Sequence, residues 1–142
     1  MHSIRDILRK KGTTVWSASP DETVLEAIRR MAEHGVGALL VLEDDQLVGL
    51  FSERDYSRKV ILQGLRSQDT SVRKVMSTPV LTISPDATVQ EGLSMMTENF
   101  VRHLPVTDGS GIAGLVSIGD LVKAVIEDQQ TLIEQLESYI TR

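Results

Sequence analysis

The hydrophobic pattern along the chain alternates between two periods. Apolar residues three or four positions apart predict amphipathic helices over residues 24–31 and 89–96. Each helix is followed by a short apolar run, a polar turn and a second apolar run, which predicts a pair of neighbouring strands. These runs are 36–43 with 47–51 in the first half and 101–108 with 112–116 in the second.

A further helix is expected to begin near Ser52 and, in the second half, near Ser117. Short apolar segments at 14–18 and 79–83 predict one more strand at the start of each half. Both halves are thus predicted to run strand, helix, strand, strand, helix.

The two halves are copies of one unit. A shift of 65 residues aligns 15–61 with 80–126 without a gap, and 18 of the 47 positions are identical, where chance gives about three. Two such copies usually pack face to face, because neither buries its apolar side alone.

The start of the first long helix in each half carries capping signals. Ser19 is predicted to cap the helix, with Pro20 at the first helical position and Glu22 completing a capping box. The second copy has Ala87 in place of that glutamate and lacks the box. The apolar residues of these helices are predicted to be core rather than a cofactor site; they are Val24, Ile28, Met31, Val89, Leu93 and Met96.

Composition narrows the class of protein. The chain has 142 residues, 41% hydrophobic and 25% charged, which is typical of one globular domain or two small fused lobes. No apolar run approaches the roughly 20 residues that span a bilayer, and the N-terminus has no secretory pattern, so a soluble, cytoplasmic protein without a membrane partner is expected. A net charge of -5 makes nucleic acid an unlikely partner.

Several chemistries lack the residues they need. The absence of cysteine excludes disulfides, thiolate metal sites and a cysteine nucleophile, and three scattered histidines do not predict a metal site. No nucleophile is paired with a base, and no glycine-rich loop is placed to hold phosphate. We therefore expect no catalytic residues and no enzyme.

A Gly-Leu-x-Ser-x-x-Asp motif occurs twice, at 49–55 and 114–120. In one interpretation Ser52 and Ser117 only cap helices, and Asp55 and Asp120 favour the positive helix end. In the other, the same helix start binds a phosphate, and the carboxylate accepts hydrogen bonds from the two hydroxyls of a ribose.

Two features favour a nucleotide site. Gly49 and Gly114 precede the motif, where a missing side chain leaves room for a ligand near the backbone, although a strand glycine also marks bulges. The first copy supplies the cations Arg54, Arg58 and Lys59. The second copy has Ile118 and Gly119 in place of Glu53 and Arg54, with Lys123 aligned to Arg58, so the two sites are not equivalent.

The repeated "SPDETV" and "SPDATV" segments, the "VRHLPV" strand and the "GLVSIGDLVKAVI" ending resemble a tandem pair of CBS domains, the Bateman module, in its stand-alone form. The resemblance covers about residues 15–126. It implies an α+β fold of two strand-helix-strand-strand-helix repeats, packed through their sheets with pseudo-two-fold symmetry. The parts are then a lead helix (1–14), repeat 1 (15–66), a linker and lead-in (67–79), repeat 2 (80–126) and a C-terminal helical extension (127–142).

The resemblance also implies a function. CBS pairs are regulatory, non-catalytic modules that bind adenosine-containing ligands (AMP, ADP, ATP, S-adenosylmethionine or NAD(H)) in clefts between the repeats, without an obligatory cofactor or metal. They form homodimers, and a regulated protein partner is expected. One site would combine Ser52 and Asp55 with Thr82, Ile83, Arg102 and His103; the other would combine Ser117 and Asp120 with Ser17, Ala18, Gly37 and Ala38. The second, lacking a "VRHLPV" strand, is expected to have no phosphate-binding cations of its own.

Three alternatives remain open from the sequence. His103 either fills space on its strand or contacts phosphate. Beyond the repeat, Leu132, Leu136 and Ile140 continue a helical stripe that packs either on its own domain or on a partner. The whole chain is either a nucleotide sensor or a structural dimerisation module in which the Ser-x-x-Asp motifs are only caps.

Overall fold

The computed structural model describes residues 2–141, which form two compact units. The first-repeat unit consists of Val15–Val80. The second-repeat unit combines residues 2–14 with 81–141. Predicted repeat 1 and the linker that follows it lie in the first-repeat unit. The residues before repeat 1 lie instead with predicted repeat 2 in the second-repeat unit.

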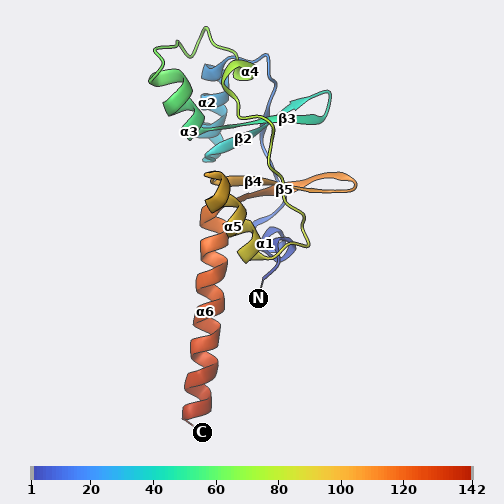
Figure 1. Ribbon diagram of the computed structural model, residues 1–142, viewed down its shortest axis with the longest axis vertical. Helices are drawn as coiled ribbons and strands as arrows, with labels where there is room; N and C mark the ends of the chain where they lie inside the picture. Colours follow the sequence, from blue (N-terminus) through green and yellow to red (C-terminus); the bar gives the residue numbers. More distant parts are fainter. Residues whose placement is uncertain (1, 142) are drawn as a thin grey trace. The chain divides into compact units, whose positions relative to one another are not determined.

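The first-repeat unit contains a three-stranded sheet in the order β1-β2-β3, of which Figure 1 labels β2 and β3. β1 runs parallel to β2, and β2 pairs antiparallel with β3 through a turn in which Asp44 and Asp45 both have positive φ. Two such residues form the turn that matches the twist of a hairpin. The elements are β1 (Ser17–Ala18), α2 (Val24–His34), β2 (Ala38–Glu43), β3 (Gln46–Ser52), α3 (Glu53–Asp55), the π-helix η1 (Tyr56–Ile61) and α4 (Val72–Val75).

The second-repeat unit repeats this arrangement with one strand fewer. Its antiparallel hairpin is β4 (His103–Asp108) with β5 (Gly111–Ser117), accompanied by α1 (Ile4–Lys11), α5 (Val89–Asn99) and α6 (Ile118–Ile140). The predicted strand at 79–83 is wrong, since only Ile83 forms a bridge, to Val106. In the first repeat the Leu40 N–H donates to the Trp16 carbonyl; the residue aligned with Leu40 is Pro105, which has no N–H to donate.

The predicted core faces are confirmed. Val24, Met31, Val89 and Met96 are buried, and Ile28 and Leu93 pack against the same two clusters. Each cluster lies between the sheet of its unit and the helices around it.

The long helices begin later than predicted. Thr23 caps α2 and Thr88 caps α5, each accepting a hydrogen bond from the backbone N–H three residues on. Ser19 instead closes a turn with Glu22, whose carboxylate accepts the Ser19 N–H at 3.0 Å. Residues 20–22 are not helical because the carbonyls of Pro20 and Glu22 accept hydrogen bonds from the segment at 72–73.

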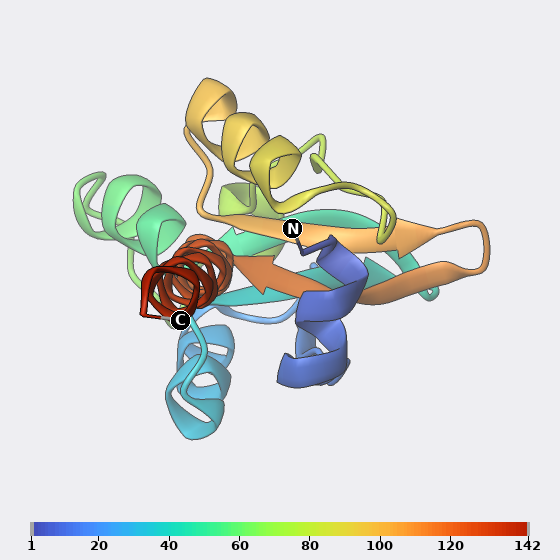
Figure 2. The same ribbon diagram turned by 90° about the horizontal axis from the view of Figure 1, so that it is seen from below.

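Each unit also contains a lead segment, which we define as residues 3–11 in the second-repeat unit and 71–77 in the first-repeat unit. Ser71 bridges to Thr23 in the first-repeat unit, and Ser3 bridges to Thr88 in the second. The N–H groups that follow Ser3 donate to the carbonyls of Ala87 and Pro85, just as those after Ser71 donate to Glu22 and Pro20. Figure 2 shows the consequence in the second unit, where α1 lies across β5 and beside α6.

Candidate functional site

The first Ser-x-x-Asp motif lies where β3 ends and α3 begins. Ser52 Oγ accepts the Asp55 N–H at 3.3 Å, and the Asp55 carboxylate accepts the Ser52 N–H at 3.0 Å. This reciprocal pair is a capping box, so the capping interpretation is correct as geometry.

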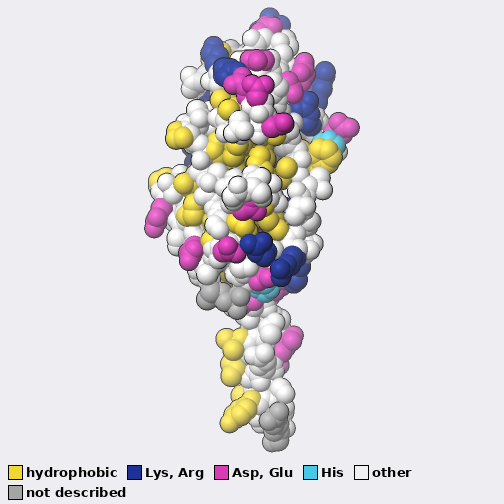
Figure 3. Space-filling model, turned by 90° about the vertical axis from the view of Figure 1, so that its right-hand side faces the viewer, with side chains coloured by type: hydrophobic (Ala, Val, Ile, Leu, Met, Phe, Trp, Pro, Cys, Tyr) yellow, Lys and Arg dark blue, Asp and Glu magenta, His cyan; other side chains and the backbone are white. Residues whose placement is uncertain are grey.

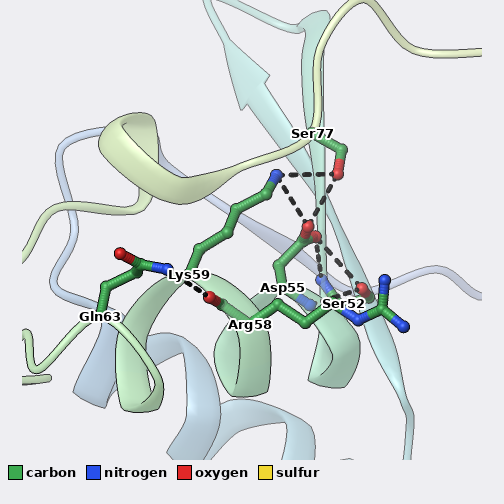
Figure 4. Close-up of polar contacts among 6 residues, drawn as sticks. All are labelled: Ser52, Asp55, Arg58, Lys59, Gln63 and Ser77. Atoms are coloured by element: carbon green, nitrogen blue, oxygen red, sulfur yellow. Dashed lines mark hydrogen bonds and ion pairs between the residues drawn. The ribbon is translucent and has the colours of Figure 1, made fainter.

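The buried Asp55 carboxylate is the centre of a polar cluster (Figure 4). Its Oδ2 accepts a further bond from the Ser52 hydroxyl at 3.1 Å, and its Oδ1 accepts from the Ser77 hydroxyl at 2.8 Å. Lys59 Nζ lies 3.0 Å from the same Oδ1 and 3.3 Å from the Ser77 hydroxyl oxygen. Both carboxylate oxygens are therefore occupied, and a ribose diol must displace Ser77 or Lys59 to reach them.

The second motif has the same box and a more accessible carboxylate. Asp120 Oδ2 accepts the Ser117 N–H at 2.8 Å, and Ser117 Oγ accepts the Asp120 N–H at 3.2 Å. Lys11 Nζ, from α1, lies 2.6 Å from the same Oδ2 and donates to the Leu115 carbonyl at 2.8 Å. The Asp120 side chain is 25% exposed, whereas that of Asp55 is 8% exposed.

A cavity of about 120 Å³ adjoins Asp120 within the second-repeat unit. Three lysines and two carboxylates line it, and Lys10 pairs with Glu127 at 3.1 Å. Two of the lysines belong to α1, which the repeat alignment left out, while the expectation that the site built on Gly37 and Ala38 lacks phosphate-binding cations stays a prediction. The lining residues are His2, Ile7, Lys10, Lys11, Asp120, Lys123, Ala124 and Glu127.

The surroundings of Asp120 lower its pKa. Burial raises the pKa of this carboxyl, but the hydrogen bonds from Lys11 and Ser117 and the charge of Lys11 outweigh burial, and the pKa lies below the ordinary value of 3.8. A lowered folded-state pKa contributes stability above the unfolded value, and this contribution is lost as the pH falls through the folded value. The Asp120 contribution therefore begins to decline at about pH 4 and is lost once the pH has fallen through the lowered pKa.

Replacing Lys11 with methionine is expected to raise the pKa of Asp120, because methionine keeps the length of the side chain and removes its charge. The titration midpoint of the Asp120 carboxyl ¹³C resonance should move to higher pH. Lys123→Met, at a lysine of the same cavity with no carboxylate oxygen within 4 Å among the described residues, is the matched control and should move it less. An unchanged midpoint in Lys11→Met would show that the ion pair does not form in solution.

The two glycines before the motifs do not leave room for a ligand. A Cβ on Gly114 would lie 2.7 Å from Leu8 Cδ2, and a Cβ on Gly49 would lie 2.9 Å from Met76 Cγ. Leu8 and Met76 are corresponding residues of the two lead segments. The prediction that these glycines admit a ligand is therefore wrong, since each is the contact point of a lead segment on its strand.

The remaining predicted site residues fall into both units. Ala38 pairs with Ser52, and His103 pairs with Ser117. The first residue of β2 and of β4 therefore lies beside the serine of its own repeat. The N–H after that serine donates to the Gly37 carbonyl in one unit and to the Arg102 carbonyl in the other. The first-repeat unit holds Ser17, Ala18, Gly37, Ala38, Ser52, Arg54, Asp55, Arg58 and Lys59; the second holds Thr82, Ile83, Arg102, His103, Ser117 and Asp120. The grouping of residues from different repeats into one site stays a prediction.

The cations of the first copy differ in role. Lys59 is ion-paired with Asp55, whereas Arg58 is exposed on η1, with its carbonyl 3.5 Å from the Gln63 amide nitrogen (Figure 4). The sequence did not reveal Ser77 or Lys11, which the fold brings to the two aspartates from the lead segments. A signal was present in the Ser-x-Arg sequence that both leads share at residues 3–5 and 71–73, 68 residues apart rather than 65.

Comparison with known proteins agrees with this architecture. The model of the CBS domain matches residues 4–61 and 72–127, so that each match begins in a lead segment. The chain therefore belongs to the CBS-domain family and carries a tandem pair of these domains. Proteins of this family are generally regulatory.

Individual relatives support the same assignment. The CBS domain-containing protein CBSX3, mitochondrial, of Arabidopsis thaliana is 37% identical over 97% of this chain and 71% of its own length. A solved putative signal-transduction protein with CBS domains from Burkholderia ambifaria superposes with a TM-score of 0.86 at 44% identity, over 90% of this chain and 96% of that one. A hexameric CBS-CP12 protein from bloom-forming cyanobacteria, 22% identical over 85% of this chain and 70% of that one with a TM-score of 0.77, shares the fold.

Two further observations concern the environment of the protein. Among residues 2–141, no helix has the length and apolarity needed to cross a bilayer. No cluster of acidic or histidine side chains suited to a metal ion occurs among the same residues. The cytoplasmic location stays a prediction, and the Arabidopsis relative is named as mitochondrial.

Proposed function

We propose that this CBS pair is a non-catalytic regulatory protein that binds an adenosine-containing ligand through its Ser-x-x-Asp motifs. The ligand class comprises AMP, ADP, ATP, S-adenosylmethionine and NAD(H). The observation that carries the proposal is the Asp120 carboxylate, partly exposed at a helix start and next to a cavity that three lysines line.

The second-repeat motif offers the groups that a nucleotide needs. The Asp120 carboxylate accepts hydrogen bonds from two ribose hydroxyls, while Ser117, the N–H groups at the start of α6 and the nearby lysines bind phosphate. Lys11 now pairs with Asp120, and a phosphate replaces Asp120 as the counter-charge of Lys11 when the carboxylate accepts hydrogen bonds from the ribose. Phosphorylated ligands are therefore expected to bind more tightly than cationic S-adenosylmethionine.

The size of these interactions sets the affinity. Hydrogen bonds to charged groups contribute about 1.5 to 3 kcal/mol each, so that four give about 6 to 12 kcal/mol. Association costs offset several kcal/mol of this. The dissociation constant is then expected between micromolar and sub-millimolar, which corresponds to a binding free energy of about -5 to -8 kcal/mol.

The two motifs are expected to differ in affinity. Asp55 is buried and its oxygens are already bonded to Ser52, Ser77 and Lys59, so a ligand there must first break protein hydrogen bonds. Asp120 has a more exposed side chain, and we assign it the tighter binding.

A signal follows only when the ligand binds two conformations of the protein unequally. In the second-repeat unit, the separation of Lys11 from Asp120 supplies such a difference, because it alters the docking of α1.

The proposal includes self-association as a homodimer, a cytoplasmic location and a regulated protein partner. The exposed part of α6 offers a surface for association. Nucleic acid and membrane are not among the proposed partners, because the chain is acidic.

A second candidate is a structural dimerisation module without a nucleotide. It is favoured by Asp55, whose carboxylate is fully bonded within its own unit, as a pure capping role requires. The two candidates differ in whether any nucleotide stabilises the folded protein.

Calorimetric titration of the wild-type protein with AMP, ATP, S-adenosylmethionine and NADH distinguishes the two candidates. We expect saturable heat with at least one phosphorylated ligand in the affinity range above, and no hydrolysis product after prolonged incubation with ATP. Absence of heat with all four ligands would favour the structural module, and steady release of ADP would contradict the non-catalytic assignment.

A further inference from the structure

Helix α6 continues far beyond the second repeat. Leu121 and Ala124 are its buried residues, and every residue from Gln129 to Thr141 is exposed. Figure 3 shows hydrophobic side chains gathered along one side of the lower end of this helix. The exposed fractions are 55% for Leu132, 54% for Leu136 and 75% for Tyr139.

These apolar residues follow a seven-residue repeat. Five of them, together with Gln129, lie at alternating intervals of three and four, and a flanking isoleucine recurs every seven residues. A pattern of this kind is typical of a helix that packs along another helix, because alternate three- and four-residue steps keep one stripe facing the partner. We call these residues the α6 seam: Val122, Val125, Gln129, Leu132, Leu136 and Tyr139, flanked by Ile126, Ile133 and Ile140.

The exposed part of α6 gains no stability from buried side chains of its own. A helix of about 12 residues without tertiary contacts is marginal in water, since most helical stability comes from packing of the apolar face. Residues 129–140 have no buried side chain. A second helix packed on the seam would provide the missing contacts.

Charge restricts the class of partner. The other faces of this segment carry Glu127, Asp128, Glu134 and Glu137, and no lysine or arginine occurs from 124 to 141. A helix that lies on a membrane surface usually carries lysine and arginine on its polar face, and nucleic acid requires the same charge. An acidic polar face disfavours both and leaves a protein helix.

The positions of the acidic residues allow a second copy to approach. With Leu132 at position d of the heptad, Glu127 and Glu134 occupy position f and Glu137 occupies position b, all away from the seam. Only Asp128 flanks the seam, at position g. Two identical seams therefore meet with one acidic residue each at their edge, Asp128, which lies 2.6 Å from His2 Nδ1, and the other described flanking positions carry no charge that selects a different chain.

We propose that the α6 seam pairs with the α6 seam of a second copy of this chain. This rests on the self-association included in the proposed function and assigns the surface that produces it. The seam residues from Gln129 onward are all exposed, whereas Val125 also packs against the core of its own unit, so substitutions at Leu132 and Leu136 leave the two repeat units folded.

The test is sedimentation equilibrium of the wild type and two matched double variants. Leu132→Glu with Leu136→Glu places two charges in the seam, and Thr131→Glu with Ser138→Glu places the same charges at position c, outside it. We expect a dimer for the wild type and the control. For the seam variant we expect the dissociation constant of the dimer to be at least about 100-fold higher. The variant should therefore sediment with the mass of a single chain, 15.7 kDa.

Each outcome decides a different point. A wild type that is monomeric at 100 μM, or that instead binds vesicles of phosphatidylcholine with phosphatidylglycerol, would overturn self-association itself. An unchanged dimer in the seam variant would overturn the seam alone. Neither result bears on nucleotide binding, which calorimetry measures separately.

Discussion

Replacing Asp55 with alanine is expected to lower the free energy of unfolding by about 2 to 3 kcal/mol. The substitution removes the acceptor for the Ser52 N–H and for the hydroxyls of Ser52 and Ser77, and it leaves Lys59 without its counter-charge. Because the Asp55 carboxylate is buried, water cannot fully replace its bonds to the two serines, whereas the 44% exposed Lys59 side chain is hydrated. Urea denaturation of the variant and the wild type measures the difference.

Asp120→Ala is the matched control for this prediction. It removes the equivalent cap, but the Asp120 side chain is 25% exposed and that of Asp55 only 8%, while the two lysines are similarly exposed, at 37% for Lys11 and 44% for Lys59. Loss of a cap at such a position costs about 1 kcal/mol. Equal losses in the two variants would contradict the difference in burial on which the assignment of tighter binding to Asp120 depends.

Gly114→Val is expected to destabilise the second-repeat unit by about 2 to 3 kcal/mol. A side chain at this strand position meets Leu8 of α1, and both the leucine and the helix must shift to admit it. Thermal unfolding followed by circular dichroism measures the loss.

Gly119→Val provides the comparison, because a Cβ there meets only Ser117 Oγ at an ordinary 3.6 Å. This variant should remain close to the wild type. If Gly114→Val were equally stable, the contact between α1 and β5 would not be a tight one.

Local sequence signals predicted most elements of the repeats. The hairpins follow from short apolar runs around polar turns, and Ser52 and Ser117 begin helices because a serine with an aspartate three residues later forms a capping box. The core faces of α2 and α5 follow from helical spacing alone. These features depend on neighbouring residues and are therefore visible in the sequence.

Contacts between distant segments were not predicted. The capping role of Ser19 failed because residues 70–73 engage the backbone around it, and the strand before Ile83 failed because Pro105 lacks a donor. The lead segments escaped the alignment because they repeat at 68 residues and the rest of the unit repeats at 65. An alignment of the two lead segments therefore needs a gap of three residues relative to the alignment of the repeats.

The two aspartates show how the duplicated site has diverged. Asp55 obtains its lysine from the next turn of its own helical segment, at Lys59. Ala124 occupies the aligned position in the second repeat, and Lys11 of α1 supplies the charge instead. The ion pair is thus retained although the sequence that provides it has changed.

Titration of AMP into the wild type and into Asp120→Asn, followed by calorimetry, tests the central claim most directly. Asparagine keeps the shape of the side chain and an oxygen for the Ser117 N–H, but it removes the charge that accepts the ribose hydroxyls. We expect the wild type to bind with a micromolar to sub-millimolar dissociation constant and the variant to bind about 10- to 150-fold more weakly, the loss of 1.5 to 3 kcal/mol. Equal affinity in the two proteins would contradict a role for Asp120 in holding the ligand.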